Sequence, residues 1–111
     1  MRLLRVDRLC LIRLESALKA IWEGTVIAQS DTTVVVEGNH YFPAESISEE
    51  NLIKTGKEYF CGWKGKAFYY DIVVDGKINA SAAWSYPSPE RAAREISGHF
   101  GFWKGVQILQ E

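Results

Sequence analysis

The sequence predicts a single, mainly β domain of seven or eight short strands, with one α-helix in its C-terminal half. Short runs of β-branched and aromatic residues alternate with turns rich in Gly and Asp, which is the pattern of an all-β chain. The 111 residues, 47% of them hydrophobic, are enough for one core and too few for a second domain. Signals for the start and the end of a helix coincide in only one segment, near residue 90.

Residues 1–17 differ in character from the rest, because arginines are interleaved with Leu, Val and Ile. The longest apolar run, residues 9–12, is shorter than the roughly 7–15 residues of a signal-peptide core and far below the ~18 needed to span a bilayer. We expect this N-terminal extension to be an added strand or helix, or the product of a start site assigned too early. The domain itself is expected to span residues 18–111.

In the first half of the domain, turn signals divide the apolar runs into short strands. Expected strands cover residues 18–22, 25–28, 32–36 and 40–42, separated by turns at Glu23-Gly24, Ser30-Asp31 and Gly38-Asn39. Residues 46–55 form a polar connector with one helical turn after Ser48, and Gly56 ends it.

The second half holds the strongest strand, residues 66–74, which is largely apolar on both faces and is therefore expected to be central. Asp75-Gly76 predicts a hairpin turn that returns residues 77–84 antiparallel. The expected helix begins at Ser88-Pro89-Glu90 and ends before Gly98, with Ala92, Ala93 and Ile96 on its apolar side. Two strands follow, at residues 100–103 and 106–109.

Charge and cysteine content exclude several classes of function. The net charge is −1, and after residue 16 nine Lys and Arg face twelve Asp and Glu, so no basic surface for nucleic acid is expected. No zinc-binding spacing is present among Cys10, Cys61, His40 and His99. Two cysteines are too few for the disulfide framework of a small secreted protein. We therefore expect a cytoplasmic protein without metal or cofactor that binds neither nucleic acid nor membrane.

Three clusters join aromatic residues to turn residues at predicted strand ends: residues 40–43, 61–65 and 83–87. Such loops beside a rigid sheet are common places for ligand sites. Lys64 could reach a carboxylate, phosphate or carbonyl oxygen while Gly65 allows backbone to approach closely; alternatively, Lys64 is a solvated turn lysine. A strand and not a helix follows Gly65, which excludes a phosphate-binding loop.

Aromatic side chains from these clusters are candidates for a ligand-binding box suited to a planar or cationic ligand. The candidates are Trp63, Trp84 and Tyr86, with Tyr41 or Tyr69. The alternative is ordinary core, which we expect for Trp22 and Trp103.

Cys61 is a candidate nucleophile if Lys64 or His40 lowers the pKa of its thiol, and otherwise a small buried apolar residue. We expect His99 to be structural. His40 is either structural or turned toward a ligand.

At these clusters the sequence resembles the bacterial and fungal family known as domain of unknown function 427. The matching stretches are Tyr41-Phe42-Pro43, Cys61-x-Trp63-Lys64-Gly65-x-Ala67-x-Tyr69, Ala82-Ala83-Trp84-x-Tyr86-Pro87-x-Pro89, and Ile96-x-Gly98 with Phe102. The resemblance covers residues 18–109 and implies a β-tent-like fold, in which two antiparallel sheets lean together. It departs from the family pattern at Gly62 (commonly Pro), Lys66 (often acidic or small) and Ser81 (often Asn or Asp).

The family is sometimes labelled nucleotidyltransferase-like, but the chain has no Gly-Ser pair followed by Asp-x-Asp to bind two metal ions. Three functions remain open. The first is a small-molecule-binding module whose pocket holds Tyr41, Cys61, Trp63, Lys64, Tyr69, Trp84 and Tyr86. The second is a thiol- or acid/base-dependent enzyme that uses Cys61 and Lys64, with His40 as a further candidate. The third is a protein-interaction domain without a pocket.

Overall fold

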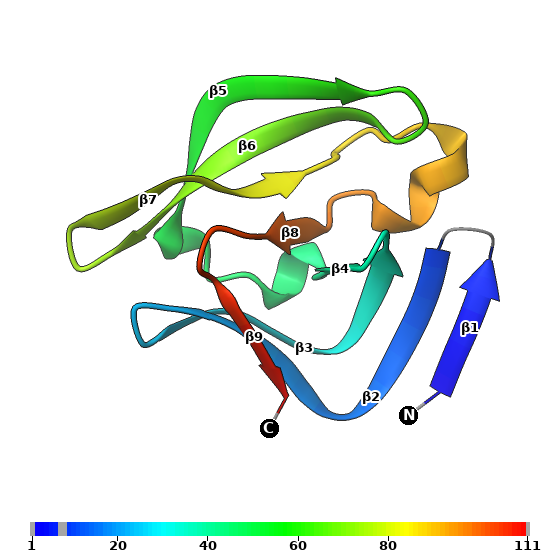
Figure 1. The fold of residues 1–111 in the computed structure, drawn as a ribbon, viewed down its shortest axis with the longest axis horizontal. Coiled ribbons are helices and arrows are strands. Elements are labelled where there is room, and N and C mark those ends of the chain that lie inside the picture. The colour runs from blue at the N-terminus through cyan, green and yellow to red at the C-terminus, as the bar shows by residue number, and fades with distance from the viewer. Residues whose placement is uncertain (1, 7–8, 111) are drawn as a thin grey trace.

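The computed structural model describes the backbone of residues 2–6 and 9–110 and the side chains of residues 17–110. The described residues form strands β1 (Arg2–Val6), β2 (Leu9–Trp22), β3 (Thr25–Val36), β4 (Asn39–Tyr41), β5 (Leu52–Cys61), β6 (Gly65–Val74), β7 (Lys77–Ser85), β8 (Phe100–Phe102) and β9 (Gln107–Gln110). Two antiparallel sheets result, with the order β1-β2-β3-β4 plus β9 on β2 in the first, and β5-β6-β7-β8 in the second. The predicted mainly β class is confirmed (Figure 1).

The two sheets join at the edge where β4 meets β8 (Figure 1). Directly after β4, the Phe42 N–H donates to the Phe100 carbonyl oxygen and the Phe100 N–H to that of Phe42, each at 2.8 Å. These two residues thus continue the hydrogen bonding from the first sheet into the second. Away from this edge the sheets diverge, which is the tent-like arrangement implied by the family resemblance.

Apolar residues form two clusters, on opposite faces of the strands that join the sheets. The larger cluster has Leu18, Ala20, Ile27, Ala28, Phe42, Ile72, Val74, Ala82, Ala83 and Phe102. The smaller has Val34, Val36, Tyr41, Ala67, Tyr86, Ala93 and Ile96. Trp22 packs against the larger cluster, as predicted for a core residue. β6 lies between β5 and β7 and is central in its sheet, as expected.

Two stretches expected to be turn or connector are strand. Ser30-Asp31 lies inside the continuous strand β3. The Ser30 hydroxyl accepts a hydrogen bond from the Thr32 N–H (3.1 Å) and donates one to the Thr32 carbonyl oxygen (2.6 Å). These backbone groups are therefore hydrogen-bonded locally, without a turn. Residues 52–55, assigned to a polar connector, begin the edge strand β5. Gly56, at φ +87°, forms a bulge there and does not end the element. The helical turn expected after Ser48 is the 3₁₀ turn Glu49–Asn51, and another 3₁₀ turn covers Ala44–Ser46.

The α-helix predicted after Ser88 is wrong. The segment Arg91–Ile96 is a kinked pair of 3₁₀ turns, interrupted at Ala93 (φ −120°, ψ 21°), and the residue at its N-terminal cap is Glu90. The kink allows both Ala93 and Ile96 to be buried in the smaller cluster. Gly98 has the positive φ (+71°) expected of a residue that ends such a turn.

The N-terminal extension shares a strand with the domain, since β2 runs from Leu9 to Trp22 across the expected boundary at residue 18. β1 pairs with the first part of β2. The separate origin of residues 1–17 stays a prediction, and their side chains before Ala17 lie outside the described residues. No helix among the described residues is long and apolar enough to cross a membrane.

A bulge in β7 is centred on Ser81, where the pairing with β6 shifts between Tyr70 and Ile72. Ser81 has a positive φ of +54° and is 8% exposed. Its N–H donates to Oδ1 of Asp71 at 2.8 Å, which holds the bulge. Left-handed backbone is costly for most side chains but is tolerated by Asn and Asp. The Asn or Asp that the family often carries here therefore suits the backbone conformation.

We expect Ser81→Asn to raise the melting temperature, by the equivalent of about 0.5–1 kcal/mol, because Asn lowers the cost of the left-handed conformation. Ser81→Val should lower it, since a β-branched side chain is least compatible with this φ. Thermal unfolding followed by far-ultraviolet circular dichroism measures both. A lower melting temperature for Ser81→Asn than for the wild type would contradict this role.

Candidate functional site

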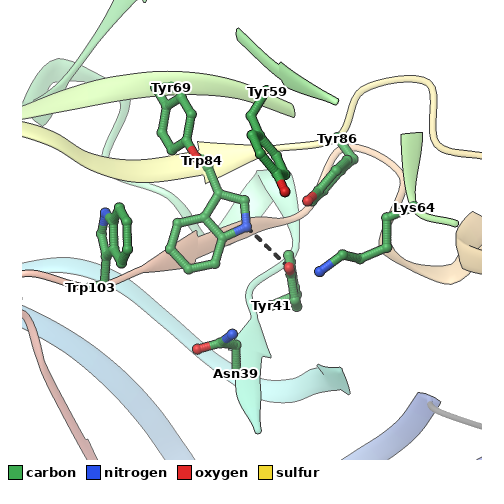
Figure 2. A pocket seen from close by; sticks show the side chains of 8 residues that line it. All are labelled: Asn39, Tyr41, Tyr59, Lys64, Tyr69, Trp84, Tyr86 and Trp103. Atoms are coloured by element: carbon green, nitrogen blue, oxygen red, sulfur yellow. Dashed lines mark hydrogen bonds between the residues drawn. The ribbon is translucent and has the colours of Figure 1, made fainter. Parts of the chain in front are cut away.

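A cavity of about 210 Å³ lies beside the joined edges of the two sheets, on the face of the second sheet that carries Tyr69 and Trp84. Figure 2 shows its lining, which consists of Asn39, Tyr41, Tyr59, Lys64, Tyr69, Trp84, Tyr86 and Trp103. The side chains form a gradient of burial. Tyr41 (0% exposed), Tyr86 (3%) and Lys64 (9%) form the floor, whereas Tyr59 (56%) and Trp103 (46%) form the rim.

Five of the seven residues predicted for a pocket line this one cavity: Tyr41, Lys64, Tyr69, Trp84 and Tyr86. The other two, Cys61 and Trp63, are half-buried, do not line the cavity and pack against the smaller core cluster. His40 precedes Tyr41 on β4, and successive side chains of a strand point to opposite faces. Its Nδ1 hydrogen-bonds Oγ1 of Thr33 at 2.8 Å, and burial lowers the pKa of its imidazole.

Sequence reasoning missed three lining residues. Trp103 was expected to be ordinary core, but it is nearly half exposed at the rim because it follows the short strand β8. Tyr59 lies on β5, which was not recognised as a strand, and pairs with Ala67 of β6. Asn39 stands two residues before Tyr41 on β4, so the alternation of the strand placed it on the same side.

Backbone contacts explain why the cluster at residues 61–65 lies beside the segment after Tyr86. The Glu90 N–H donates to the Lys64 carbonyl oxygen at 3.0 Å. Gly65 has φ +104°, and a Cβ at this position would lie 3.1 Å from the backbone nitrogen of Glu90. Any side chain at residue 65 would therefore push the two segments apart, which accounts for glycine after Lys64.

The aromatic wall is centred on Trp84, whose indole packs directly on Gly101 of β8. A Cβ at residue 101 would lie 2.6 Å from Cζ2 of Trp84, so only glycine leaves room for the ring. The Trp84 Nε1–H donates to the Tyr41 hydroxyl at 3.0 Å (Figure 2). Tyr41 and Trp103 both meet Trp84 edge-to-face, with ring centroids 6.0 and 5.7 Å away. These contacts fix the orientation of the indole.

Lys64 is the one cation in the lining, and its side chain is only 11% exposed, which corrects the alternative of a solvated turn lysine. Its ammonium donates to Oε1 of Glu37 at 2.5 Å and lies 5.6 Å from the ring centroids of Trp63 and Tyr86. Burial by itself lowers the pKa of Lys64, but the hydrogen bond to Glu37 and the nearby Tyr41 and Tyr86 outweigh it and raise the pKa. Lys64 is therefore charged at neutral pH.

The floor tyrosines are held in the neutral phenol form. Burial raises the pKa of Tyr41, although the hydrogen bond from Trp84 opposes the shift. Burial also raises the pKa of Tyr86 to about 12, against the opposing charge of Lys64. Since an indole N–H can only donate, the Tyr41 oxygen is an acceptor in its bond with Trp84 and keeps its own proton for another partner. The floor therefore presents hydrogen-bond donors.

Comparison with known proteins identifies the family of the chain. A family model described as a domain of unknown function, DUF427, matches residues 11–110. The chain belongs to the DUF427 family. No curated protein matches the sequence. The matched range includes every residue that lines the cavity.

Two further features of this DUF427 domain bear on chemistry. Within the described residues, no group of three or more His, Cys, Asp or Glu side chains is placed to hold a metal ion. Ser81, where the family often has Asn or Asp, is not part of the lining and acts on the backbone of β7.

We expect Gly101→Ala to destabilise the protein by about 1–3 kcal/mol, because the added methyl overlaps the Trp84 ring. Equilibrium urea unfolding followed by tryptophan fluorescence measures the loss. Gly62→Ala is the matched control, since nothing lies within 4 Å of a Cβ at that residue. Equal stability of the two variants would show that Gly101 does not support the indole.

The raised pKa of Tyr86 predicts a loss of stability in alkali. Because its folded value of about 12 exceeds the ordinary 10.0, its contribution is complete below pH 10 and is lost as the pH rises toward 12. The unfolding free energy of the wild type should therefore fall more steeply over this range than that of Tyr86→Phe. Denaturant titrations at half-unit pH intervals measure both slopes. Parallel slopes would contradict the shift.

Proposed function

We propose that this DUF427 domain is a small-molecule-binding module and that the cavity holding Lys64 and Trp84 is its binding site. The observation that carries the proposal is the convergence on one cavity of four side chains from the three sequence clusters, together with Tyr69 of β6. A concave site with mostly aromatic walls and a few buried polar groups is the usual form of a small-ligand site.

The size and lining of the cavity favour a compact, flat ligand. Its volume of about 210 Å³ is below the roughly 300–1,000 Å³ of sites for drug-sized molecules. Trp84 and Trp103 offer apolar ring surface, whereas Lys64 and the Tyr86 hydroxyl offer hydrogen-bond donors at the floor. A planar molecule of one ring with polar substituents at one end matches both requirements.

The alternative of an enzyme that uses the Cys61 thiol has less support. Cys61 is a half-buried free cysteine that packs against the smaller core cluster and is not among the lining residues. A substrate in the cavity would meet Tyr41 and Lys64 before it met the thiol. An interaction domain without a pocket is disfavoured by the cavity itself. A bacterial, cytoplasmic setting is part of the proposal and rests on the family resemblance and the low cysteine content.

A thermal-shift screen with a library of small planar metabolites tests the proposal. A ligand at ten times its Kd stabilises the native state by about 1.4 kcal/mol, which should raise the melting temperature by several degrees for a domain of this size. Ligands of this site should lose most of the shift with Trp84→Leu and with Lys64→Met. They should keep it with Lys77→Met, since Lys77 is an exposed lysine that does not line the cavity.

Cys61→Ser separates binding from thiol chemistry, and it should leave the shift unchanged. A screen in which every hit stabilises the wild type and Trp84→Leu equally, or in which no compound depends on the cavity, would contradict the proposed site.

A further inference from the structure

Charged groups are distributed unevenly around the cavity. No Asp or Glu occurs among its lining residues, whereas Lys64 contributes a positive charge and the tyrosines contribute neutral hydroxyls. The negative partner of Lys64 is Glu37, which stands outside the lining on the turn between β3 and β4. The floor is thus suited to a negative group. In the protein itself the Glu37 carboxylate, which lies outside the lining, fills this role.

The two members of this ion pair differ in burial. The Lys64 side chain is 11% exposed and that of Glu37 46% exposed. If the pair separated, the half-exposed Glu37 carboxylate would remain in contact with water, whereas the buried Lys64 ammonium would need a new anionic partner. An anion that enters the cavity can meet this need, because an ammonium carries three N–H donors and its hydrogen bond to Glu37 uses one of them.

The cavity is poorly suited to a cationic ligand. A cation would be drawn to the faces of aromatic rings, but the Lys64 ammonium already lies 5.6 Å from the ring centroids of Tyr86 in the lining and of Trp63 outside it. A second cation there would be repelled by the first. The aromatic walls therefore favour a flat apolar body, and the floor favours a negative end.

We propose, on the basis of the binding function proposed above, that the ligand is a compact aromatic carboxylate whose oxyanion competes with Glu37 for Lys64. In Figure 2 the Lys64 ammonium is directed toward the Tyr41 hydroxyl, at the buried end of the space that Trp84 and Trp103 border. A ring that stacks against the tryptophans would carry its carboxylate to this end. Glu37 then acts as an internal competitor that sets the affinity.

The chain contains a matched control for Glu37. Glu23-Gly24 and Glu37-Gly38 are both turns with positive φ at each residue (49° and 75°; 53° and 82°). Glu23 pairs with Lys77 at 3.0 Å as Glu37 pairs with Lys64, but the Lys77 side chain is 68% exposed. The same substitution can therefore be made in the same local backbone at Glu37, whose lysine lines the cavity, and at Glu23, whose lysine does not.

Three probes of one shape and different charge test the inference: benzoate, benzamide and benzamidinium. Isothermal titration at constant ionic strength should give the order benzoate, benzamide, benzamidinium from tightest to weakest for the wild type. Glu37→Gln should tighten benzoate about tenfold and leave benzamide unchanged, since a hydrogen bond to a charged group is typically worth at least that factor. Glu23→Gln should change neither, and Lys64→Met should remove the preference for benzoate.

Glu37→Asp gives a second variant in case loss of the charge prevents folding. Asp-Gly already occupies a turn of this kind at Asp75-Gly76 (φ 48° and 79°), so the backbone accepts it. The shorter side chain withdraws the carboxylate from Lys64, and benzoate affinity should lie between those of the wild type and Glu37→Gln. An affinity no higher than that of the wild type in both variants would overturn the inference.

The outcomes distinguish this inference from the proposed function. If benzamide or benzamidinium binds as tightly as benzoate and requires Trp84, the cavity is a binding site, but the inference that its ligand is a carboxylate is wrong. If no probe binds the wild type or Glu37→Gln, the carboxylate is again wrong, and the library screen decides separately whether the cavity binds other compounds.

Discussion

The reciprocal pair of backbone hydrogen bonds between Phe42 and Phe100 is the contact on which the rest of the site depends. Each such bond contributes only about 0.5–1.5 kcal/mol net to stability. The pair is therefore important for where it joins the sheets and not for its free energy. The pair fixes β4 beside β8, and thereby brings Tyr41 next to Trp84, which is paired with Gly101 of β8. Without this contact the two sheets would share a core but no defined cavity.

The parts of the fold that the sequence predicts are those that local chemistry determines. Asp75-Gly76 ends a strongly apolar strand and makes the expected hairpin, because Asp and Gly are residues that readily accept the backbone of such a turn. The edge strand β5 was missed, since its exposed residues carry no apolar alternation and its pairing depends on β6. The helix was wrong because Ala93 and Ile96 are buried together in the smaller cluster, and that tertiary contact prevails over the capping signals at Ser88.

The site was predictable to the extent that its residues stand at strand ends in compact motifs. Such motifs identify a neighbourhood, but not which side chain faces the cavity. Tyr41 and its neighbour His40 illustrate this, because alternation sends one to the cavity and the other to Thr33. Glu37 and Trp103 could not be connected to Lys64 and Trp84 from the sequence, since those contacts exist only after the sheets have joined.

The lining comes from segments spread between Asn39 and Trp103, and both sheets contribute. A species in which only one sheet has formed therefore lacks a complete cavity. Strand pairings between distant segments generally form slowly and late in folding. A ligand of this cavity would consequently recognise the fully assembled domain alone, and its binding would slow global unfolding without protecting any single hairpin.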